Sequence, residues 1–401
     1  MKRYDTYKDS GIEWIGGIPS DWKTSRIRYI VDSQKGKNPK EFSFVESSNS
    51  MVYLAMDYLR GEPKQIYYIE NPSEYTIVDE NQILLLWDGS NAGEFIMSKK
   101  GILSSTMAIL NIKYLHKRFV WYFFKYFERF LKESTIGMGI PHVNGDELKN
   151  NYISYPPLPE QTAIASFLDR KTAEIAQLIA DKKRLIELYE EEKTVIINQA
   201  VTKGIDPNVK MKDSGIEWLE EIPEHWEVKR LKYVVDMKSG SGITSEMIKE
   251  EGEYPVYGGN GLRGYFNSFT HDGDFILIGR QGALCGNINY GIGKFWASEH
   301  ALVCSSKSLF VIKWLGELLR VMNLNQYSVS AAQPGLSVEN LKILQIPVPY
   351  LSEQFLIVSH IETECARINA KIEKTKKLIE LLSEYRTTLI SEVVTGKINV
   401  I

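Results

Sequence analysis

The chain has 401 residues, 43% of them apolar and 25% charged, which is enough for two or three domains with buried cores. No apolar run approaches the roughly 18 residues of a membrane span, and the N-terminus lacks the apolar core of a secretory signal, so we expect a cytoplasmic protein without a membrane partner. The net charge of −3 argues against a strongly basic surface. The three cysteines lack CxxC spacing, which argues against structural disulfides, and the six histidines are scattered, which argues against a metal site.

An internal repeat, the first pattern to look for in such a chain, divides the sequence into two halves. Residues 8–14, Lys-Asp-Ser-Gly-Ile-Glu-Trp, recur letter for letter at residues 212–218, an offset of 204. A second block, which includes Glu-Gln at 160–161 and at 353–354, recurs at an offset of 193. The segment between the blocks is therefore 11 residues longer in the first half. The halves agree at their ends and differ in their middles.

The repeat predicts two variable α/β domains flanked by repeated segments. In chain order we expect an N-terminal repeated segment at 1–26, a first variable domain at 27–155, a central segment with a long helix at 156–208, a copy of the N-terminal segment at 209–230, a second variable domain at 231–348 and a C-terminal segment with a long helix at 349–401. The first variable domain holds 15 basic and 15 acidic residues, and the second is also close to neutral. Any affinity for nucleic acid would therefore have to come from local clusters or from a basic partner.

Short apolar runs bounded by turn residues predict strands in both variable domains, and longer apolar segments predict one helix in each. The expected strands lie at 82–87, 108–112, 274–278 and 301–304, and the expected helices at 119–131 and 309–324. Aromatic residues crowd the first of these helices. They would suit base stacking, but their helical spacing favours packing into a core.

Each repeated segment that follows a variable domain reads as one long helix with a proline-rich lead-in, at 155–159 and at 346–349. Apolar residues follow alternating three- and four-residue steps over 165–200 and, in the same register, over 358–393. An apolar seam kept for more than four heptads on two helices predicts that they form a coiled coil together. The alternative is two unrelated amphipathic helices, each packed on its own core.

The sequence carries no recognisable catalytic motif. Residues 259–264 fit the GxGxxG spacing of dinucleotide-binding loops, but their flanks predict glycine turns between strands. Residues 191–193 contain half of a nuclease motif, yet they lie on a long helix and are interpreted as a solvated face. GxxxxGK[ST], HExxH and GxSxG are all absent from the sequence. An active site is therefore not predicted.

Polar residues in loops near the predicted strands are the candidates for contact with DNA bases. Arginine and lysine pair with guanine in the major groove, and asparagine and glutamine pair with adenine. The candidates are Asp88, Ser90, Asn91, Lys99, Lys100, Ser104, Ser105 and Thr106 in the first domain, and Asn260, Arg263, Arg280, Gln281, Lys294, Trp296 and His300 in the second. For each of them the alternative is a solvated loop residue without a ligand.

Over essentially its whole length the chain resembles the specificity subunit of type I restriction–modification systems. The resemblance is carried by the two KDSGIEW…IP..W segments, the proline lead-ins to Glu-Gln, the helix ends at 200–204 and 393–397, and the stretch YPVYGGNGLRGY that begins at Tyr254. It implies two globular α/β target recognition domains, each of which reads one half of a bipartite, asymmetric DNA site. It also implies that a pair of long antiparallel coiled-coil helices separates them, with pseudo-two-fold symmetry between the halves.

The same resemblance implies the partners and the division of labour. The partners would be double-stranded DNA, two methyltransferase subunits that use S-adenosylmethionine, and restriction (motor–nuclease) subunits that use ATP and magnesium. This chain would hold no cofactor and carry neither activity. Two other interpretations stay open: a stand-alone nuclease or methyltransferase on a duplicated scaffold, and a scaffold that binds only protein. The missing catalytic motifs count against the first, and the divergent middles count against the second.

Overall fold

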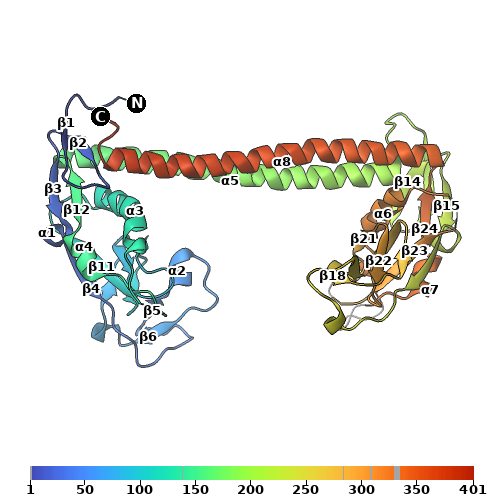
Figure 1. The fold of residues 1–401 in the computed structure, drawn as a ribbon, viewed down its shortest axis with the longest axis horizontal. Coiled ribbons are helices and arrows are strands. Elements are labelled where there is room, and N and C mark those ends of the chain that lie inside the picture. The colour runs from blue at the N-terminus through green and yellow to red at the C-terminus, as the bar shows by residue number, and fades with distance from the viewer. Residues whose placement is uncertain (1, 138, 283, 308, 329–334) are drawn as a thin grey trace. The chain divides into compact units, whose positions relative to one another are not determined.

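The computed structural model describes residues 2–137, 139–282, 284–307, 309–328 and 335–401 (Figure 1). The chain forms two compact units. Unit 1 comprises Met1–Lys182 and Lys377–Ile401, and unit 2 comprises Lys183–Lys376. Two long helices, α5 (Leu158–Lys203) and α8 (Leu351–Val394), contribute residues to both units.

Unit 1 combines short strands with helices. Its strands are β1 (Tyr7–Asp9), β2 (Gly17–Pro19), β3 (Lys23–Arg26), β4 (Val31–Lys35), β5 (Ser50–Leu54), β6 (Tyr68–Glu70), β7 (Ile77–Val78), β8 (Ile83–Leu86), β9 (Phe95–Met97), β10 (Gly101–Leu103), β11 (Met107–Ile112) and β12 (Tyr152–Tyr155). Its shorter helices are α1 (Ile27–Ile30), α2 (Met56–Arg60), the 3-10 helix η1 (Pro72–Glu74), α3 (Lys117–Glu133) and α4 (Gly145–Asn150).

Two four-stranded sheets form the centre of the described part of unit 1. The first has the order β4-β11-β8-β9 and is antiparallel throughout. The second has the order β6-β5-β10-β7 and pairs β5 with β10 in parallel. Strand β3 pairs with β12, and β1 pairs with β2.

The aromatic helix belongs to the core of unit 1. Helix α3 covers the predicted range, and Phe119, Phe123, Phe124 and Phe127 are fully buried. Phe124 stacks on Phe95 of β9, with ring centroids 4.6 Å apart. The core interpretation is therefore confirmed over base stacking.

Unit 2 is built from a similar set of elements. Its strands are β13 (Met211–Ile216), β14 (Leu219–Pro223), β15 (Glu227–Arg230), β16 (Val235–Ser239), β17 (Tyr254–Gly258), β18 (Gly261–Phe266), β19 (His271–Asp272), β20 (Phe275–Gly279), β21 (Ile288–Gly291), β22 (Lys294–Ala297), β23 (Ala301–Ser306) and β24 (Gln345–Val348). Its shorter helices are η2 (Leu231–Tyr233), η3 (Ser245–Met247), α6 (Ile312–Val321), η4 (Leu324–Tyr327) and α7 (Val338–Ile343).

The sheets of unit 2 reproduce the topology of unit 1. Their orders are β16-β23-β20-β21 and β18-β17-β22-β19, and β17 pairs with β22 in parallel. Strand β15 pairs with β24 as β3 pairs with β12, and β13 pairs with β14 as β1 pairs with β2. Two middles that share little sequence therefore have the same strand order, and the four predicted strands are β8, β11, β20 and β23.

The units differ mainly in the connections. Between the paired residues Val52 and Tyr68 lie 15 residues that include α2, whereas the pair Val256 and Gly264 encloses seven. Part of the additional length of the first half therefore lies in this connection. The helix predicted at 309–324 is shorter than expected, because Asn323 adopts a left-handed φ of 47° and η4 follows.

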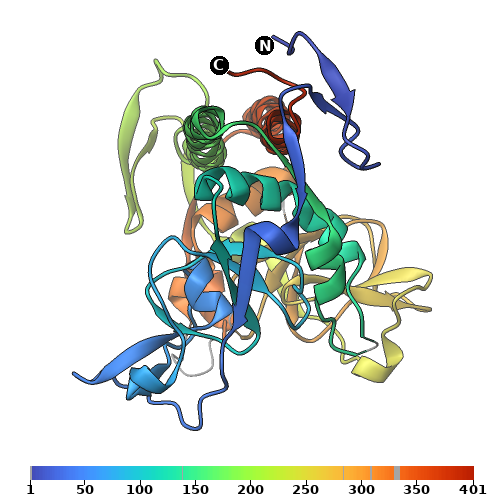
Figure 2. The same cartoon turned by 90° about the vertical axis from the view of Figure 1, so that its left-hand side faces the viewer.

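The long helices pack against each other in antiparallel fashion, as each unit shows by itself. In unit 1, Leu168 and Ile175 of α5 share a core with Leu389 and Val393 near the C-terminal end of α8. The two helices lie side by side in Figure 2. In unit 2, the later part of α5 meets the earlier part of α8. There Arg367 Nη2 lies 3.0 Å from Glu192 Oε1, and Lys371 Nζ lies 5.3 Å from the ring centroid of Tyr189. The coiled-coil prediction is confirmed.

Helix α5 begins slightly earlier than its proline lead-in predicts, whereas α8 (Leu351–Val394) begins after its own. Helix α5 starts at Leu158, so Pro159 lies in its first turn. Proline is tolerated there because the first N–H groups of a helix have no intrahelical acceptor. Residues 191–193 lie on α5 as expected, and Glu192 and Lys193 contact α8.

Candidate nucleic-acid interface

A tryptophan–glutamate pair from the repeated segments occupies the same place in both units. The indole N–H of Trp22 donates to Glu160 Oε1 at 3.1 Å. Trp226 donates in the same way to Glu353, with both carboxylate oxygens at 3.0 Å. Both tryptophans are only 1% exposed. Because a buried N–H without an acceptor destabilises a fold, each tryptophan requires its glutamate.

The neighbouring glutamine fixes the start of the helix that packs on the main sheet of each unit, as we call β4-β11-β8-β9 and β16-β23-β20-β21. Gln161 Oε1 accepts from the backbone N–H of His116, the N-cap residue of α3, at 2.8 Å, and Gln161 Nε2 donates to Pro156 O at 2.8 Å. Gln354 makes the equivalent bond to the N–H of Val311, the N-cap residue of α6, at 2.8 Å. The repeated residues therefore tie each long helix to its variable domain.

A loop with two glycines follows one of the two central strands of each main sheet, β8 in unit 1 and β20 in unit 2. We call residues 87–93 after β8 and residues 280–286 after β20 the glycine loops; residue 283 lies outside the described residues. Their glycines have positive φ values, 107° and 91° in unit 1 and 85° and 89° in unit 2. In both loops the N–H of the second glycine donates to the carbonyl oxygen of the strand end at 2.8 Å. Positive φ favours glycine. The described residues of the two loops therefore share these glycine conformations and this hydrogen bond, while their side chains differ.

A second loop lies beside each glycine loop. We call residues 104–106, which join β10 to β11, and residues 298–300, which join β22 to β23, the interface turns. The backbone N–H of Trp87 donates to Thr106 O at 2.8 Å, and that of Arg280 donates to His300 O at 2.9 Å. Each unit therefore presents one composite surface, formed by a glycine loop and an interface turn.

Most of the predicted base-contacting residues meet on these two surfaces. Exposed or half-buried in unit 1 are Asp88, Ser90, Asn91, Ser105 and Thr106, and in unit 2 Arg280, Gln281 and His300. The hairpin between β17 and β18 adds Asn260, whose Oδ1 accepts from Asn287 Nδ2 at 3.0 Å. The predicted glycine turn is confirmed at 259–260, whereas 261–264 belong to β18. Arg263 is exposed on β18 of the same hairpin.

Several candidates lie away from these surfaces or use their polar atoms inside the domain. Ser104 is 4% exposed and bonds to the Tyr53 hydroxyl at 2.8 Å, so it packs within the unit. Lys99 donates to Tyr58 O at 2.8 Å, and the indole of Trp296 donates to Ser241 O at 3.2 Å. Lys100 and Lys294 are exposed, but they lie at the opposite ends of β10 and β22 from the interface turns. Side chains alternate between the two faces of a strand, and the strand's length sets how far each lies from the interface turn. Both depend on the sheet, and both separate these residues from the others.

Sequence reasoning missed three residues at these surfaces. Lys35 Nζ lies 3.0 Å from Asp88 Oδ2, and His142 Nδ1 lies 2.6 Å from Asp88 Oδ1. Burial acts to raise the pKa of Asp88, but the hydrogen bonds and charges of His142 and Lys35 outweigh it and hold that pKa below its ordinary value. In unit 2, Arg280 Nη1 donates to Ser239 Oγ at 3.0 Å. Lys35 and Ser239 are related by the repeat offset of 204, which is the only sequence signal that links them.

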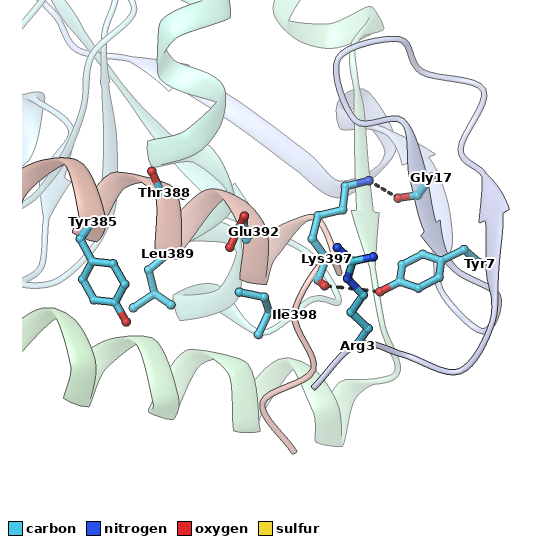
Figure 3. Close-up of a pocket in the computed structure, with 9 residues that line it drawn as sticks. All are labelled: Arg3, Tyr7, Gly17, Tyr385, Thr388, Leu389, Glu392, Lys397 and Ile398. Carbon is cyan, nitrogen blue, oxygen red and sulfur yellow. Dashed lines mark hydrogen bonds between the residues drawn. The ribbon is translucent and has the colours of Figure 1, made fainter. Parts of the chain in front are cut away.

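A further pocket of about 690 Å³ lies in unit 1 where the N-terminal segment meets the end of α8 (Figure 3). Lys397 donates from Nζ to Gly17 O, and the Tyr7 hydroxyl donates to Lys397 O at 3.4 Å. Burial lowers the pKa of Lys397. Lys2 and Asn399 form a β-bridge nearby. These contacts join the two chain ends, and we assign the pocket a structural role.

Neither a membrane-spanning helix nor a metal cluster is found in the part of the chain that the structure describes. No helix there is both long and apolar enough to cross a bilayer. No group of three or more His, Cys, Asp or Glu side chains there is arranged to hold a metal ion.

Solved structures with a similar fold come from type I systems. A chain from a study of complex assembly and conformational transition of the type I R-M system aligns with a TM-score of 0.72 at 16% identity, covering 95% of this chain and 99% of that one. The HsdS subunit from Thermoanaerobacter tengcongensis aligns with a TM-score of 0.57 at 16% identity, covering 95% and 98%. These likenesses confirm the fold class of two α/β domains with long helices.

Sequence comparison identifies the family. A family model described as type I restriction modification DNA specificity domain matches residues 19–188 and again residues 223–381. The type I restriction enzyme MjaVIII specificity subunit of Methanocaldococcus jannaschii is 32% identical, over 98% of this chain and 97% of that protein. The type I restriction enzyme EcoprrI specificity subunit of Escherichia coli is 40% identical, over 36% of this chain and 41% of that protein. The chain therefore belongs to the family of type I restriction–modification specificity subunits.

Proposed function

We propose that this chain reads a bipartite, asymmetric site on double-stranded DNA, one half-site with each variable domain, on behalf of a type I restriction–modification complex. The observation that carries the proposal is the matched pair of surfaces. Each unit presents a glycine loop and an interface turn with the same backbone hydrogen bonds, while the side chains differ, Asp88 against Gln281 and Thr106 against His300. Two readers of one architecture with different polar groups suit two different half-sites.

As a specificity subunit the chain is non-catalytic, and we assign the chemistry to its partners. These are two methyltransferase subunits that use S-adenosylmethionine and restriction subunits that use ATP and magnesium. The alternative of a stand-alone nuclease or methyltransferase on a duplicated scaffold finds no support in the sequence comparisons.

We assign the docking of the methyltransferase subunits to apolar side chains on the outer face of the long helices. In unit 1, Leu378, Leu381 and Tyr385 of α8 are each at least 39% exposed, and Leu378 and Leu381 directly precede the seam residues Ile379 and Leu382. In unit 2, Leu188 and Val195 of α5 have the same relation to the seam and are 45% and 63% exposed. A helix with two adjacent apolar stripes packs against two neighbours. One stripe in each unit suits two copies of one partner.

The docking assignment is tested by single substitutions that place a charge in one stripe. Leu381→Glu and Leu188→Glu should each reduce the number of methyltransferase subunits bound per chain from two to one, measured by mass in solution. Glu384→Gln, on the same helix but outside the stripe, is the control and should leave two subunits bound. Full occupancy in both leucine variants would contradict the assignment.

The reading function is tested by assembling the chain with its methyltransferase partner and mapping the methylated sites. We expect one bipartite recognition sequence from the complex and no methylation from the chain alone. The chain alone should also bind DNA weakly at physiological salt, because both variable domains are close to neutral and phosphate contacts supply much of protein–DNA affinity. Methylation by the isolated chain would favour the stand-alone enzyme, and a complex without sequence preference would refute the reading function.

A further inference from the structure

We infer that Lys35 and His142 contact bases in the half-site read by unit 1, and that Asp88 is the positioning residue that holds both. This inference rests on the proposed reading function and assigns base contacts to Lys35 and His142, which the loop pattern did not single out. It further assigns the contact of Lys35 to a guanine, because lysine donates to the O6 and N7 acceptors of that base in the major groove.

The acceptor, Asp88, is less exposed than the two donors, Lys35 and His142, that contact it. The side chain of Asp88 is 22% exposed, while those of Lys35 and His142 are 45% and 48% exposed. The carboxylate uses one oxygen for each partner, Oδ2 for Lys35 at 3.0 Å and Oδ1 for His142 at 2.6 Å. An acceptor-only group whose two oxygens are engaged has little left to offer a base. Asp88 itself is therefore a poor reader, and the groups in front of it are the good ones.

Lys35 and His142 keep donor or acceptor capacity for DNA. Among the described residues Asp88 is the only hydrogen-bond partner of the Lys35 ammonium group, so two of its three protons remain. The Trp87 ring, with its centroid 5.2 Å from Lys35 Nζ, adds a cation–π contact that restrains the side chain. A carboxylate at Nδ1 of His142 fixes the proton on that nitrogen and leaves Nε2 for another partner.

Backbone contacts from three separate segments hold this cluster in place. Lys35 ends β4 and pairs with Ala108 of β11. Asp88 lies in the glycine loop and forms a β-bridge with His142. On the next residue, the N–H of Val143 donates to Trp87 O at 2.8 Å. A reader must be held in position by its surroundings to discriminate between bases, and these contacts supply that restraint.

Unit 2 places the same kind of pair at the same junction with the roles exchanged. In unit 1 the cation, Lys35, is on the strand and its acceptor, Asp88, is on the glycine loop. In unit 2 the cation, Arg280, is on the glycine loop, and its acceptor, Ser239, is on the strand at the position that matches Lys35. Gly335 takes the place of His142, since it forms the β-bridge with Gln281. Both units therefore hold one cation at the junction of strand and glycine loop, and this recurrence points to a shared use.

The test uses the assembled methyltransferase complex and maps methylated sites for Lys35→Met, His142→Ala and Asp88→Asn. Lys35→Met should relax discrimination at one guanine of one half-site on the order of tenfold, with the other half-site unchanged. His142→Ala should relax a base pair in the same half-site. Asp88→Asn should relax the same positions, and adding it to Lys35→Met should cause no further loss at the guanine, because residues that act through one contact are not additive.

The matched control is Lys113→Met. Lys113 Nζ lies 3.0 Å from Asp32 Oδ1, and its side chain is 42% exposed, so it resembles Lys35 in charge, pairing and exposure. It follows β11 at the end of the sheet away from the glycine loop. This variant should leave the recognised sequence unchanged.

The failure of this inference is distinguishable from failure of the proposed function. If the unmodified complex methylates a bipartite site but Lys35→Met and His142→Ala leave both half-sites unchanged, the inference is wrong and the reading function stands. Uniform weakening on all sequences with a flatter salt dependence would mean that Lys35 meets phosphate, which also overturns it. If the unmodified complex has no sequence preference, the reading function itself fails.

Discussion

The two variable domains have the same strand order and different surfaces. In the main sheets, β4-β11-β8-β9 and β16-β23-β20-β21, the central strands are apolar and buried in both units. At the junction of strand and glycine loop the first domain carries Lys35, Asp88 and His142, and the second carries Ser239 and Arg280. This fold therefore depends on buried apolar strands and a few glycines. The side chains of its loops are therefore free to differ.

The repeated segments outside the variable domains, which we call the framework, keep several of the same side chains in both units. Trp22 with Glu160 and Trp226 with Glu353 are the same residues making the same hydrogen bonds. A buried indole N–H accepts few substitutes for its carboxylate, because any change leaves a buried polar group without a partner. Framework positions should therefore tolerate little change in either unit, and loop positions should change the sequence that is read.

The strongest test of this division exchanges one domain. Replacing residues 27–155 by the corresponding region of another specificity subunit should change one half-site completely and leave the other intact, because the two reading surfaces belong to separate units. The measurement is the map of methylated sites of the assembled complex. The reciprocal exchange of residues 231–348 is the control and should change the other half-site. An exchange that alters both half-sites, or neither, would contradict the claim that each variable domain reads one half-site.

Matched glycines test whether the two folds have the same steric requirement. A Cβ on Gly36 would lie 2.3 Å from the carbonyl oxygen of Ser104, and one on Gly240 would lie 2.3 Å from that of Ser298. Gly36→Ala and Gly240→Ala should therefore each destabilise their own unit by about 3 kcal/mol. Hydrogen exchange of each unit measures the effect separately. Gly242→Ala, whose added Cβ meets no atom within 4 Å, is the control and should have little effect. A large loss at only one of the two matched sites would show that the turns are not equivalent.

Matched glutamines test the framework in the same way, with a smaller effect. Gln161→Ala and Gln354→Ala each leave a helix N-cap N–H and a proline carbonyl without their side-chain partner, which costs about 2 kcal/mol for buried groups. We expect equal destabilisation of the two units and no change in the recognised sequence. Thr162→Ala, an exposed neighbour of Gln161, is the control. An altered half-site in either variant would mean that the framework takes part in reading.

The smallest expected effect concerns the cysteines of unit 2. Burial raises the pKa of the Cys304 thiol to about 12 and also raises that of Cys285. Both thiols should stay protonated and unreactive toward a thiol reagent at pH 8 until the unit unfolds. Because the folded-state pKa of Cys304 is raised, its stabilising contribution is complete below the ordinary thiol pKa of 9.0 and is lost as the pH rises toward 12. Rapid labelling of Cys304 in the native complex at pH 8 would contradict the burial.

Several features of the molecule could be predicted from the sequence because they depend on local patterns. The two long helices follow from a seam of three- and four-residue steps, and α3 follows from the helical spacing of its aromatic residues. The strands β8, β11, β20 and β23 follow from short apolar runs. Periodicity of this kind depends only on residues that are close in sequence, so it can be recognised without knowing the fold. The repeat itself also indicated two units of one design.

The tertiary structure decided which polar side chains meet at each surface. Asp88 was predicted as a contact residue, but its partners Lys35 and His142 are 53 and 54 residues away in the chain and reach it only through sheet pairing. Ser104 and Thr106 are two residues apart in one turn, yet Ser104 is buried and Thr106 is exposed. Neither fact has a local signal, because contact and burial arise from segments that are distant in sequence and adjacent only after folding. The physical reason is that side-chain chemistry is local while hydrogen bonding and packing between strands are not.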